Sequence, residues 1–98
     1  MTKSAFHELE LRNADELVTK SQLMRVVTAE IKKRGVTQFV AGEILALDQP
    51  NVSALMNEKI SRFSVEKLME FAGKLGFVVT IHIEGNGVAV DVPVQSAA

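Results

Sequence analysis

Cysteine is absent from this 98-residue sequence, which excludes disulfide bonds and thiolate chemistry. The absence is typical of a reducing compartment, so we expect a cytoplasmic protein. Long apolar runs are missing near the start as well. The first 17 residues, MTKSAFHELELRNADEL, carry a charge every few positions and predict neither a signal peptide nor a membrane span. We therefore expect no membrane contact.

Motifs of catalysis and metal binding are also missing. The sequence contains no nucleophile elbow, no glycine-rich phosphate loop and no zinc-ligand spacing. Its 2 histidines, His7 and His82, lie in separate segments without partners at metal-ligand spacing. These absences predict a protein that is not an enzyme and has no catalytic residues, cofactor or bound metal.

The sequence also lacks an excess of either positive or negative charge. With 11 basic and 12 acidic side chains the formal net charge is −1, which argues mildly against nucleic-acid binding, because phosphate contacts come mainly from lysine and arginine. The distribution is more informative, since residues 21–74 hold 8 basic and 6 acidic side chains while both flanks are net acidic. A weakly basic centre predicts modest DNA affinity per chain, which a dimer on two half-sites would strengthen.

The most informative stretch runs from Thr37 to Asn57, TQFVAGEILALDQPNVSALMN. Thr37 and Asp48 are side chains that cap helix N-termini, and apolar residues recur at helical spacing after each of them. This pattern predicts two short helices joined by a tight turn at Leu47, a helix-turn-helix. We expect the inner faces to consist of Val40, Ala41, Ile44, Leu45, Val52 and Leu55, and the outer face of the second helix to consist of Gln49, Asn51, Ser53 and Ala54.

The outward side chains of the second helix predict contact with DNA. A glutamine or asparagine on a helix in the major groove can bond an adenine bidentately. A purely structural role accounts for Asp48 as an N-cap and for Pro50 as a proline in the first turn. It does not account for Gln49, Asn51 and Ser53 all pointing outward, so we predict that this set contacts bases or phosphates.

The sequence divides into three predicted parts: residues 1–12 as a loosely docked arm, residues 13–76 as the helix-turn-helix domain, and residues 77–94 as a β-hairpin. We expect the first long helix to begin at an Asn13-Glu16 capping box, with an apolar stripe of Leu17, Met24, Val27 and Ile31. It should end in Lys32, Lys33 and Arg34 before Gly35. That basic cluster fits either complementation of the helix dipole or phosphate contact.

A last helix and the hairpin follow the central motif. Ser64 predicts an N-cap, and the helix after it has an apolar stripe of Val65, Leu68, Ala72 and Leu75 and stops at Gly76. From Phe77 apolar residues alternate, and the sequence Gly85-Asn86-Gly87 predicts a turn to a second alternating strand. A lone hairpin is marginal in water, so we expect a homodimer. Pro93 blunts the second strand, which favours the strand from Phe77 to Glu84 for pairing across chains.

The segments TQ, LALDQPNVSAL, FS and LG, with a small residue at Gly42, resemble the XRE-type helix-turn-helix family. The layout over roughly residues 13–84 is similar to small antitoxins of the HigA kind, from type II toxin–antitoxin systems. The resemblance implies a mainly α, four- to five-helix, lambda-repressor-like domain with a C-terminal β-hairpin. It also implies a transcriptional repressor that binds double-stranded operator DNA as a dimer, represses its own operon and neutralises an RNA-cleaving toxin, a small protein partner.

Carried onto this sequence, the resemblance places Gln38 at a phosphate and Gln49 and Asn51 at base edges. Pro50 and Ala54 would offer apolar contact, for instance with a thymine methyl. Ala46 stands where relatives have glycine, so either the turn differs or a non-glycine residue adopts a left-handed backbone. Because Glu58 repels phosphate, Lys59 and Arg62 are the expected backbone contacts. The complete predicted DNA-binding set is Thr37, Gln38, Gln49, Pro50, Asn51, Ser53, Ala54, Asn57, Lys59 and Arg62.

Two alternatives to this function stay open. The main role could be inhibition of a toxin through the acidic N-terminal segment, with DNA binding secondary. Equally, the protein could be a stand-alone repressor of phage-like or controller type without a toxin partner.

Overall fold

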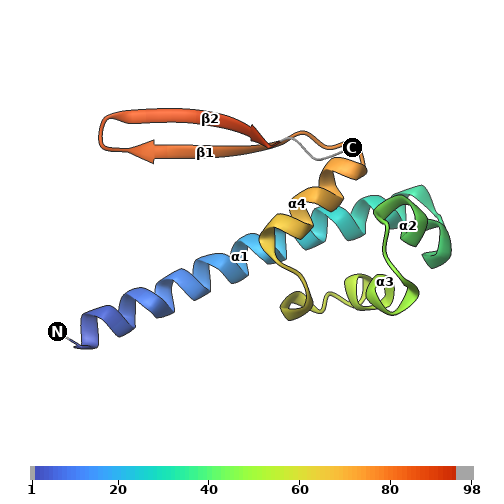
Figure 1. Ribbon diagram of the computed structural model, residues 1–98, viewed down its shortest axis with the longest axis horizontal. Helices are drawn as coiled ribbons and strands as arrows, with labels where there is room; N and C mark the ends of the chain where they lie inside the picture. Colours follow the sequence, from blue (N-terminus) through green and yellow to red (C-terminus); the bar gives the residue numbers. More distant parts are fainter. Residues whose placement is uncertain (1, 95–98) are drawn as a thin grey trace.

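The computed structural model describes residues 2–94, with side chains from Asp15 onward. Five helical elements precede a two-stranded hairpin, in the order α1 (Thr2–Arg34), α2 (Gln38–Leu45), α3 (Gln49–Met56), the 3-10 helix η1 (Ile60–Arg62), α4 (Val65–Lys74), β1 (Val79–Gly85) and β2 (Val88–Val94). Figure 1 shows α2, α3 and α4 gathered against the C-terminal half of α1, with the hairpin beyond α4. The predicted fold class, a mainly helical helix-turn-helix domain with a C-terminal hairpin, is confirmed.

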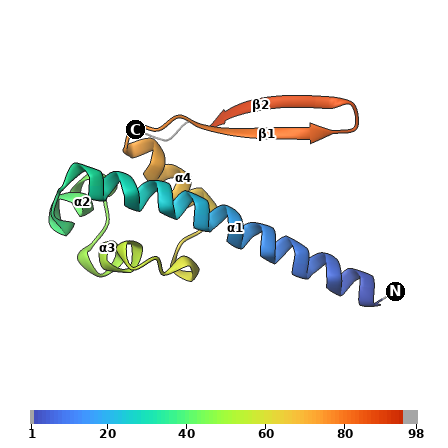
Figure 2. The same cartoon turned by 180° about the vertical axis from the view of Figure 1, so that it is seen from behind.

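Helix α1 is longer than predicted. It begins at Thr2, so the predicted helix start at Asn13 is wrong. The sequence from 2 to 34 contains neither glycine nor proline, so no residue interrupts the helical backbone at the expected capping box. The helix ends as predicted at Gly35, whose φ of +66° gives the left-handed geometry that glycine adopts without strain. Its N-terminal part extends past the other helices (Figures 1 and 2), and the molecule measures 50 × 29 × 21 Å.

The core lies where α1 meets the shorter helices, and it contains most of the residues expected there. The predicted core positions that are buried are Met24, Val27, Ile31, Ala41, Leu45, Val52, Leu55, Leu68, Ala72 and Leu75. Phe63 and Phe71, which the periodicity did not single out, are buried too and meet edge to face with ring centroids 5.9 Å apart.

Two predicted core residues are exposed instead. Leu17 is 53% exposed because it lies about two turns before Met24, where α1 has already left the bundle. Val40 is 36% exposed because α2 buries the stripe of Ala41, Gly42 and Leu45, which leaves its neighbour at the edge of the helix.

Two cations hold helix ends together across the domain. The Arg34 Nη2 atom donates a hydrogen bond of 2.7 Å to the carbonyl oxygen of Leu75, and its Nε donates one of 2.9 Å to Glu30 Oε2. The Lys74 Nζ atom lies 3.4 Å from the carbonyl oxygen of Leu45. Arg34 therefore has a structural role, while Lys32 and Lys33 remain exposed for either of the roles predicted for the basic cluster.

The hairpin forms with the predicted turn. Gly85 pairs with Val88, so the loop is Asn86-Gly87, and both loop residues have positive φ (51° and 76°) as a type I′ turn requires. The first strand begins at Val79, so Phe77 lies outside it. The register pairs apolar residues with one another on one face and sets His82 against Asp91 on the other.

Candidate nucleic-acid interface

Each helix of the helix-turn-helix is capped at its N-terminus by its own side chain. The Thr37 hydroxyl accepts a hydrogen bond of 3.2 Å from the Val40 N–H, and Asp48 Oδ1 accepts one of 3.0 Å from the Asn51 N–H. Both predicted caps are confirmed. Pro50 stands in the first turn of α3, where the missing N–H leaves no helical bond unmade.

The turn between α2 and α3 uses a left-handed residue that is not glycine. Ala46 has φ 57° and ψ 46°, and its N–H donates to the carbonyl oxygen of Gly42. The Leu47 N–H donates to the same oxygen at 2.9 Å. Of the two alternatives that the sequence left open, the non-glycine residue with a strained backbone is therefore the correct one.

Gly42 allows α2 and α3 to approach closely. A Cβ atom at this position would lie 2.7 Å from the Leu47 carbonyl oxygen and 3.2 Å from Val52 Cγ2. A side chain there would push the turn and α3 away from α2. The predicted small residue thus fixes the angle at which α3 is presented.

The two helix N-termini place Gln38 and Gln49 on the same exposed groove. This groove of about 330 Å³ runs between α2 and the start of α3, and its floor includes Gly42, Leu47 and Val52. Of the predicted DNA-binding set, the exposed members are Thr37, Gln38, Gln49, Pro50, Asn57, Lys59 and Arg62, and the half-buried members are Asn51 and Ser53. Two side chains that the sequence predicted on separate helices, Gln38 and Gln49, thus line one groove.

Ala54 is the member of the predicted set that does not belong on the outer face. It is 8% exposed and packs in the core, so the prediction that it points outward is wrong. Successive helical residues are only about 100° apart, which puts Ala54 next to the fully buried Leu55 on the inner side of α3. Asn57 is exposed, but its Nδ2 donates 2.9 Å to the Ser53 carbonyl oxygen and so also closes the end of α3.

Phe39 is an exposed residue of this groove that the apolar pattern missed. It is 72% exposed, in the first turn of α2, and lines the groove together with Gln38 and Gln49. A large aromatic residue outside the predicted inner face of an amphipathic helix was the signal in the sequence that could have identified it.

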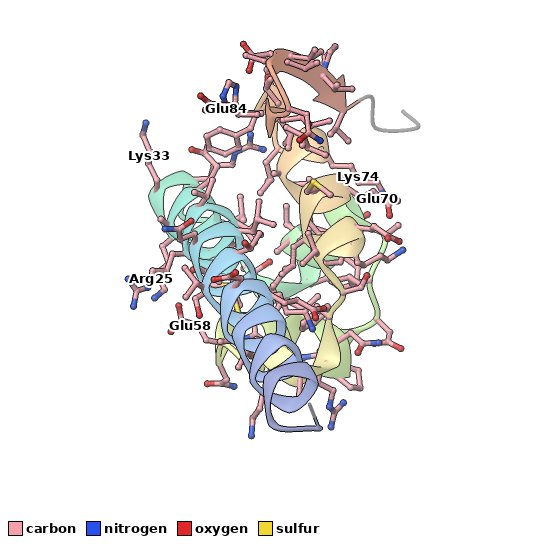
Figure 3. The ribbon with its side chains drawn as sticks, turned by 90° about the vertical axis from the view of Figure 1, so that its left-hand side faces the viewer. Arg25, Lys33, Glu58, Glu70, Lys74 and Glu84 are labelled. Atoms are coloured by element: carbon pink, nitrogen blue, oxygen red, sulfur yellow. The ribbon has the colours of Figure 1, made fainter. Side chains whose placement is uncertain are left out.

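Charge is unevenly distributed around this surface. Lys59 and Arg62 are exposed next to α3, with no salt bridge found for either among residues 15–94, while Glu58 stands beside them with φ 54°. Figure 3 shows Arg25 projecting from α1 on the side of Glu58, and the two residues line one small pocket. Glu43 and Asp48 make the groove itself acidic. The exposed positive charge on this side of the domain therefore lies after α3 and not in the groove.

On α4 the cations are already engaged. Glu70 lies 3.2 Å from Lys67 Nζ and 3.5 Å from Lys74 Nζ, and Figure 3 shows Glu70 and Lys74 side by side. The hydrogen bond and charge of Lys67 lower the pKa of Glu70, with Lys74 adding to the effect. These lysines are engaged by Glu70 and are poor candidates for phosphate contact.

Comparison with known proteins identifies the family. A model of a helix-turn-helix domain family matches residues 5–84, which is most of the chain. The chain belongs to this helix-turn-helix family. A solved structure, named provisionally as an XRE family transcriptional regulator, is 31% identical and superposes with a TM-score of 0.69 over 88% of this chain and 98% of that one. A search of curated proteins finds no match.

The chain is thus a helix-turn-helix protein of the XRE type and belongs to the DNA-binding transcription regulators. Among the side chains of residues 15–94 there is no group of three or more His, Cys, Asp or Glu residues that could hold a metal ion. None of the helices between residues 2 and 94 has the length and apolar content needed to cross a membrane.

Proposed function

We propose that this protein is a sequence-specific repressor that binds operator DNA in the cytoplasm as a homodimer. The observation that carries the proposal is the shared groove of Gln38 and Gln49, which exposes two amides at adjacent helix N-termini. An amide there can bond an adenine edge while its neighbour bonds a phosphate. In this arrangement α3 lies in the major groove with Gln49 and Asn51 toward the bases.

The remaining contacts follow from position and charge. Thr37 is exposed just before α2, Ser53 is half-buried on α3, and the exposed Pro50 offers apolar contact. Lys59 and Arg62 bind phosphates on one side of the groove. With so few cations, one domain binds weakly, and two half-sites on a dimer supply the affinity.

Replacing Gln49 with Ala tests the placement of α3. The change should weaken operator binding by about 1–3 kcal/mol at one base position of each half-site. Affinities are measured by mobility shift for both proteins on the native operator and on operators substituted at each position. At the contacted position the substituted operator should bind both proteins equally, which serves as the internal control. If Gln49→Ala and Asn51→Ala both leave operator binding unchanged, α3 does not read the bases.

Changing Lys59 to Ala tests the phosphate contacts separately. It should weaken binding to all operators uniformly and reduce the slope of log affinity against log salt by about one for each half-site, or about two for the dimer. Lys67→Ala is the matched control, because that lysine is engaged by Glu70 on α4.

We further propose that the protein is an antitoxin, which represses its own operon and neutralises an RNA-cleaving toxin. The projection of α1 beyond the bundle supports this role, since a helix without neighbours is accessible to a partner (Figure 1). The net acidic charge of the first twenty residues suits a basic enzyme.

Deleting residues 1–12 tests this second role. The truncated protein should keep operator binding and lose neutralisation of the toxin. Retained neutralisation would show that the segment is not the inhibitory element. The neighbouring open reading frame separates the alternatives: a small basic protein favours the antitoxin, and its absence favours a stand-alone phage-like or controller-type repressor.

A further inference from the structure

The hairpin has an apolar face that nothing among the side chains of residues 15–94 covers. The register places the apolar side chains of both strands on one face, namely Val79, Ile81, Ile83, Val88, Val90, Val92 and Val94. Val79 packs on the edge of the core, but from Ile81 outward the side chains are between 40% and 53% exposed. Two strands without further support are marginal in water, so this face needs a partner.

The uncovered face forms one wall of a wedge. A groove of about 430 Å³ lies at the base of the hairpin, between β1, Met69 of α4 and the side of α1 that carries Leu23 and Val26. Farther out, the hairpin and the N-terminal half of α1 diverge, as the two opposite views in Figures 1 and 2 show. The wedge is therefore apolar at its base and widens toward the tip of the hairpin.

We propose that a second copy of this chain closes the wedge, with the apolar faces of the two hairpins packed sheet on sheet. The inference rests on the homodimer of the proposed function and specifies its interface. A two-fold axis between the hairpins makes the contact self-complementary, since each hairpin enters the wedge of the other chain. The two layers lie about 10 Å apart, as in other stacked sheets.

The area available suits such a dimer. Six aliphatic side chains, five on the hairpin and Val26 on α1, are each 40% to 53% exposed. Together they offer on the order of 500 Å² of side-chain surface per chain, so the pair would bury about 1,000 Å², near the lower limit of specific interfaces. The groove residues Leu23 and Met69 would add to this area.

The opposite face of the hairpin carries polar, exposed side chains. His82 Nδ1 lies 2.6 Å from Asp91 Oδ1, and its Nε2 lies 3.2 Å from Glu84 Oε2, with all three side chains more than half exposed. A dimer that pairs the two β1 edges would extend the sheet and leave the apolar face in water. Packing of the faces buries the apolar side chains between the two hairpins and leaves the charged cluster on the far side of each hairpin, so the geometry favours faces over edges.

Two lysine substitutions on adjacent residues test whether the apolar face of the hairpin forms the dimer contact. Val90 lies on the apolar face and Ala89 on the polar face, so Val90→Lys and Ala89→Lys add the same charge on opposite sides of β2. In light scattering without DNA, the wild type and Ala89→Lys should be dimers and Val90→Lys a monomer. Because Val90 is half exposed within one chain, its loss should leave the helical domain folded, as circular dichroism would show. The milder Val90→Ala should raise the dimer dissociation constant about tenfold or more.

A proline substitution tests whether the two chains pair through their β1 edges. A two-residue loop makes Gly85 and Val88 a hydrogen-bonded pair, and alternation then points the His82 N–H away from β2. His82→Pro therefore removes an edge donor without breaking the hairpin ladder, and His82→Thr controls for loss of the imidazole. Both variants should remain dimers.

Three results would overturn the inference: a dimeric Val90→Lys, a monomeric wild type, or a monomeric His82→Pro beside a dimeric His82→Thr. Operator binding is measured separately on the same samples. A dimer that fails to bind DNA contradicts the proposed repressor but not the interface, whereas a DNA-binding protein that is monomeric contradicts the homodimer and its interface but not sequence-specific DNA binding.

Discussion

The Leu47 carbonyl oxygen lies 2.7 Å from the place where a Cβ atom on Gly42 would be, and the Leu47 N–H donates to the Gly42 carbonyl at 2.9 Å. The two residues thus meet backbone to backbone across the turn. This contact sets how far α3 stands from α2, and with it the distance between the amides of Gln38 and Gln49.

Gly42→Ala should disturb both stability and DNA binding. The added methyl group meets a backbone oxygen that cannot rotate away, so we expect the free energy of unfolding to fall by about 1–3 kcal/mol. Operator affinity should fall as well, because α3 must shift. Urea unfolding and mobility shift measure the two effects. Unchanged stability would mean that the turn relaxes at no free-energy expense.

Ala46→Gly should have the opposite effect on stability. A left-handed backbone costs an L-residue about 1–2 kcal/mol, and glycine avoids that strain. Part of the gain is offset because glycine has more freedom in the unfolded chain, so we expect the free energy of unfolding to rise by about 1 kcal/mol or less. Operator binding should not change. A loss of stability in urea unfolding would contradict the strain that φ 57° implies.

Arg34→Ala should destabilise the domain more than Lys33→Ala. Arg34 donates to the Leu75 carbonyl oxygen, joining the end of α1 to the end of α4, whereas no side-chain hydrogen bond of Lys33 is found among residues 15–94. A hydrogen bond from a charged donor is worth about 1.5–3 kcal/mol, and the control should lose less than about 0.5 kcal/mol. Equal losses for the two variants in urea unfolding would exclude this structural role for Arg34.

The hairpin should respond to pH through His82. Hydrogen bonds with Asp91 and, to a smaller extent, with Glu84 raise the pKa of His82 above its ordinary value of 6.5. The stabilisation is therefore complete below the unfolded pKa and is lost as pH rises through the folded pKa.

Asp91→Asn tests this pH dependence, since it should lower the pKa of His82 in an NMR titration. Glu84→Gln should lower it less, and His7, on a different element, serves as the reference. A His82 pKa unchanged by Asp91→Asn would show that the ion pair does not form in solution.

Local signals in the sequence predicted local structure well. The hydroxyl or carboxylate of Thr37, Asp48 and Ser64 accepts a bond from an amide three residues later, so each cap could be identified without the fold. Asn13 shows the weakness of the same rule. A capping box starts a helix only if the chain before it is not helical, and nothing in the preceding residues breaks a helix.

Burial on short helices depended on the fold. The close contact at Gly42 sets which side chains of α2 and α3 face the core. The prediction was therefore wrong for Val40, which is exposed, and for Ala54, which is buried. The sequence placed the amides of Gln38 and Gln49 on the exposed surface, but it predicted neither the groove between them nor its shape. Phe39 was missed because periodicity identifies buried positions and says little of exposed ones.

Pro93 gives the hairpin one further property. It pairs with Thr80 at a position whose N–H would point away from β1, so its ring removes a donor from the outer side of β2 without weakening the hairpin. An open-ended stack of chains needs two usable edges on every hairpin, and here one of them is impaired. Association through the C-terminal strands is thereby self-limiting, which protects a small protein with so much exposed valine and isoleucine from fibril growth.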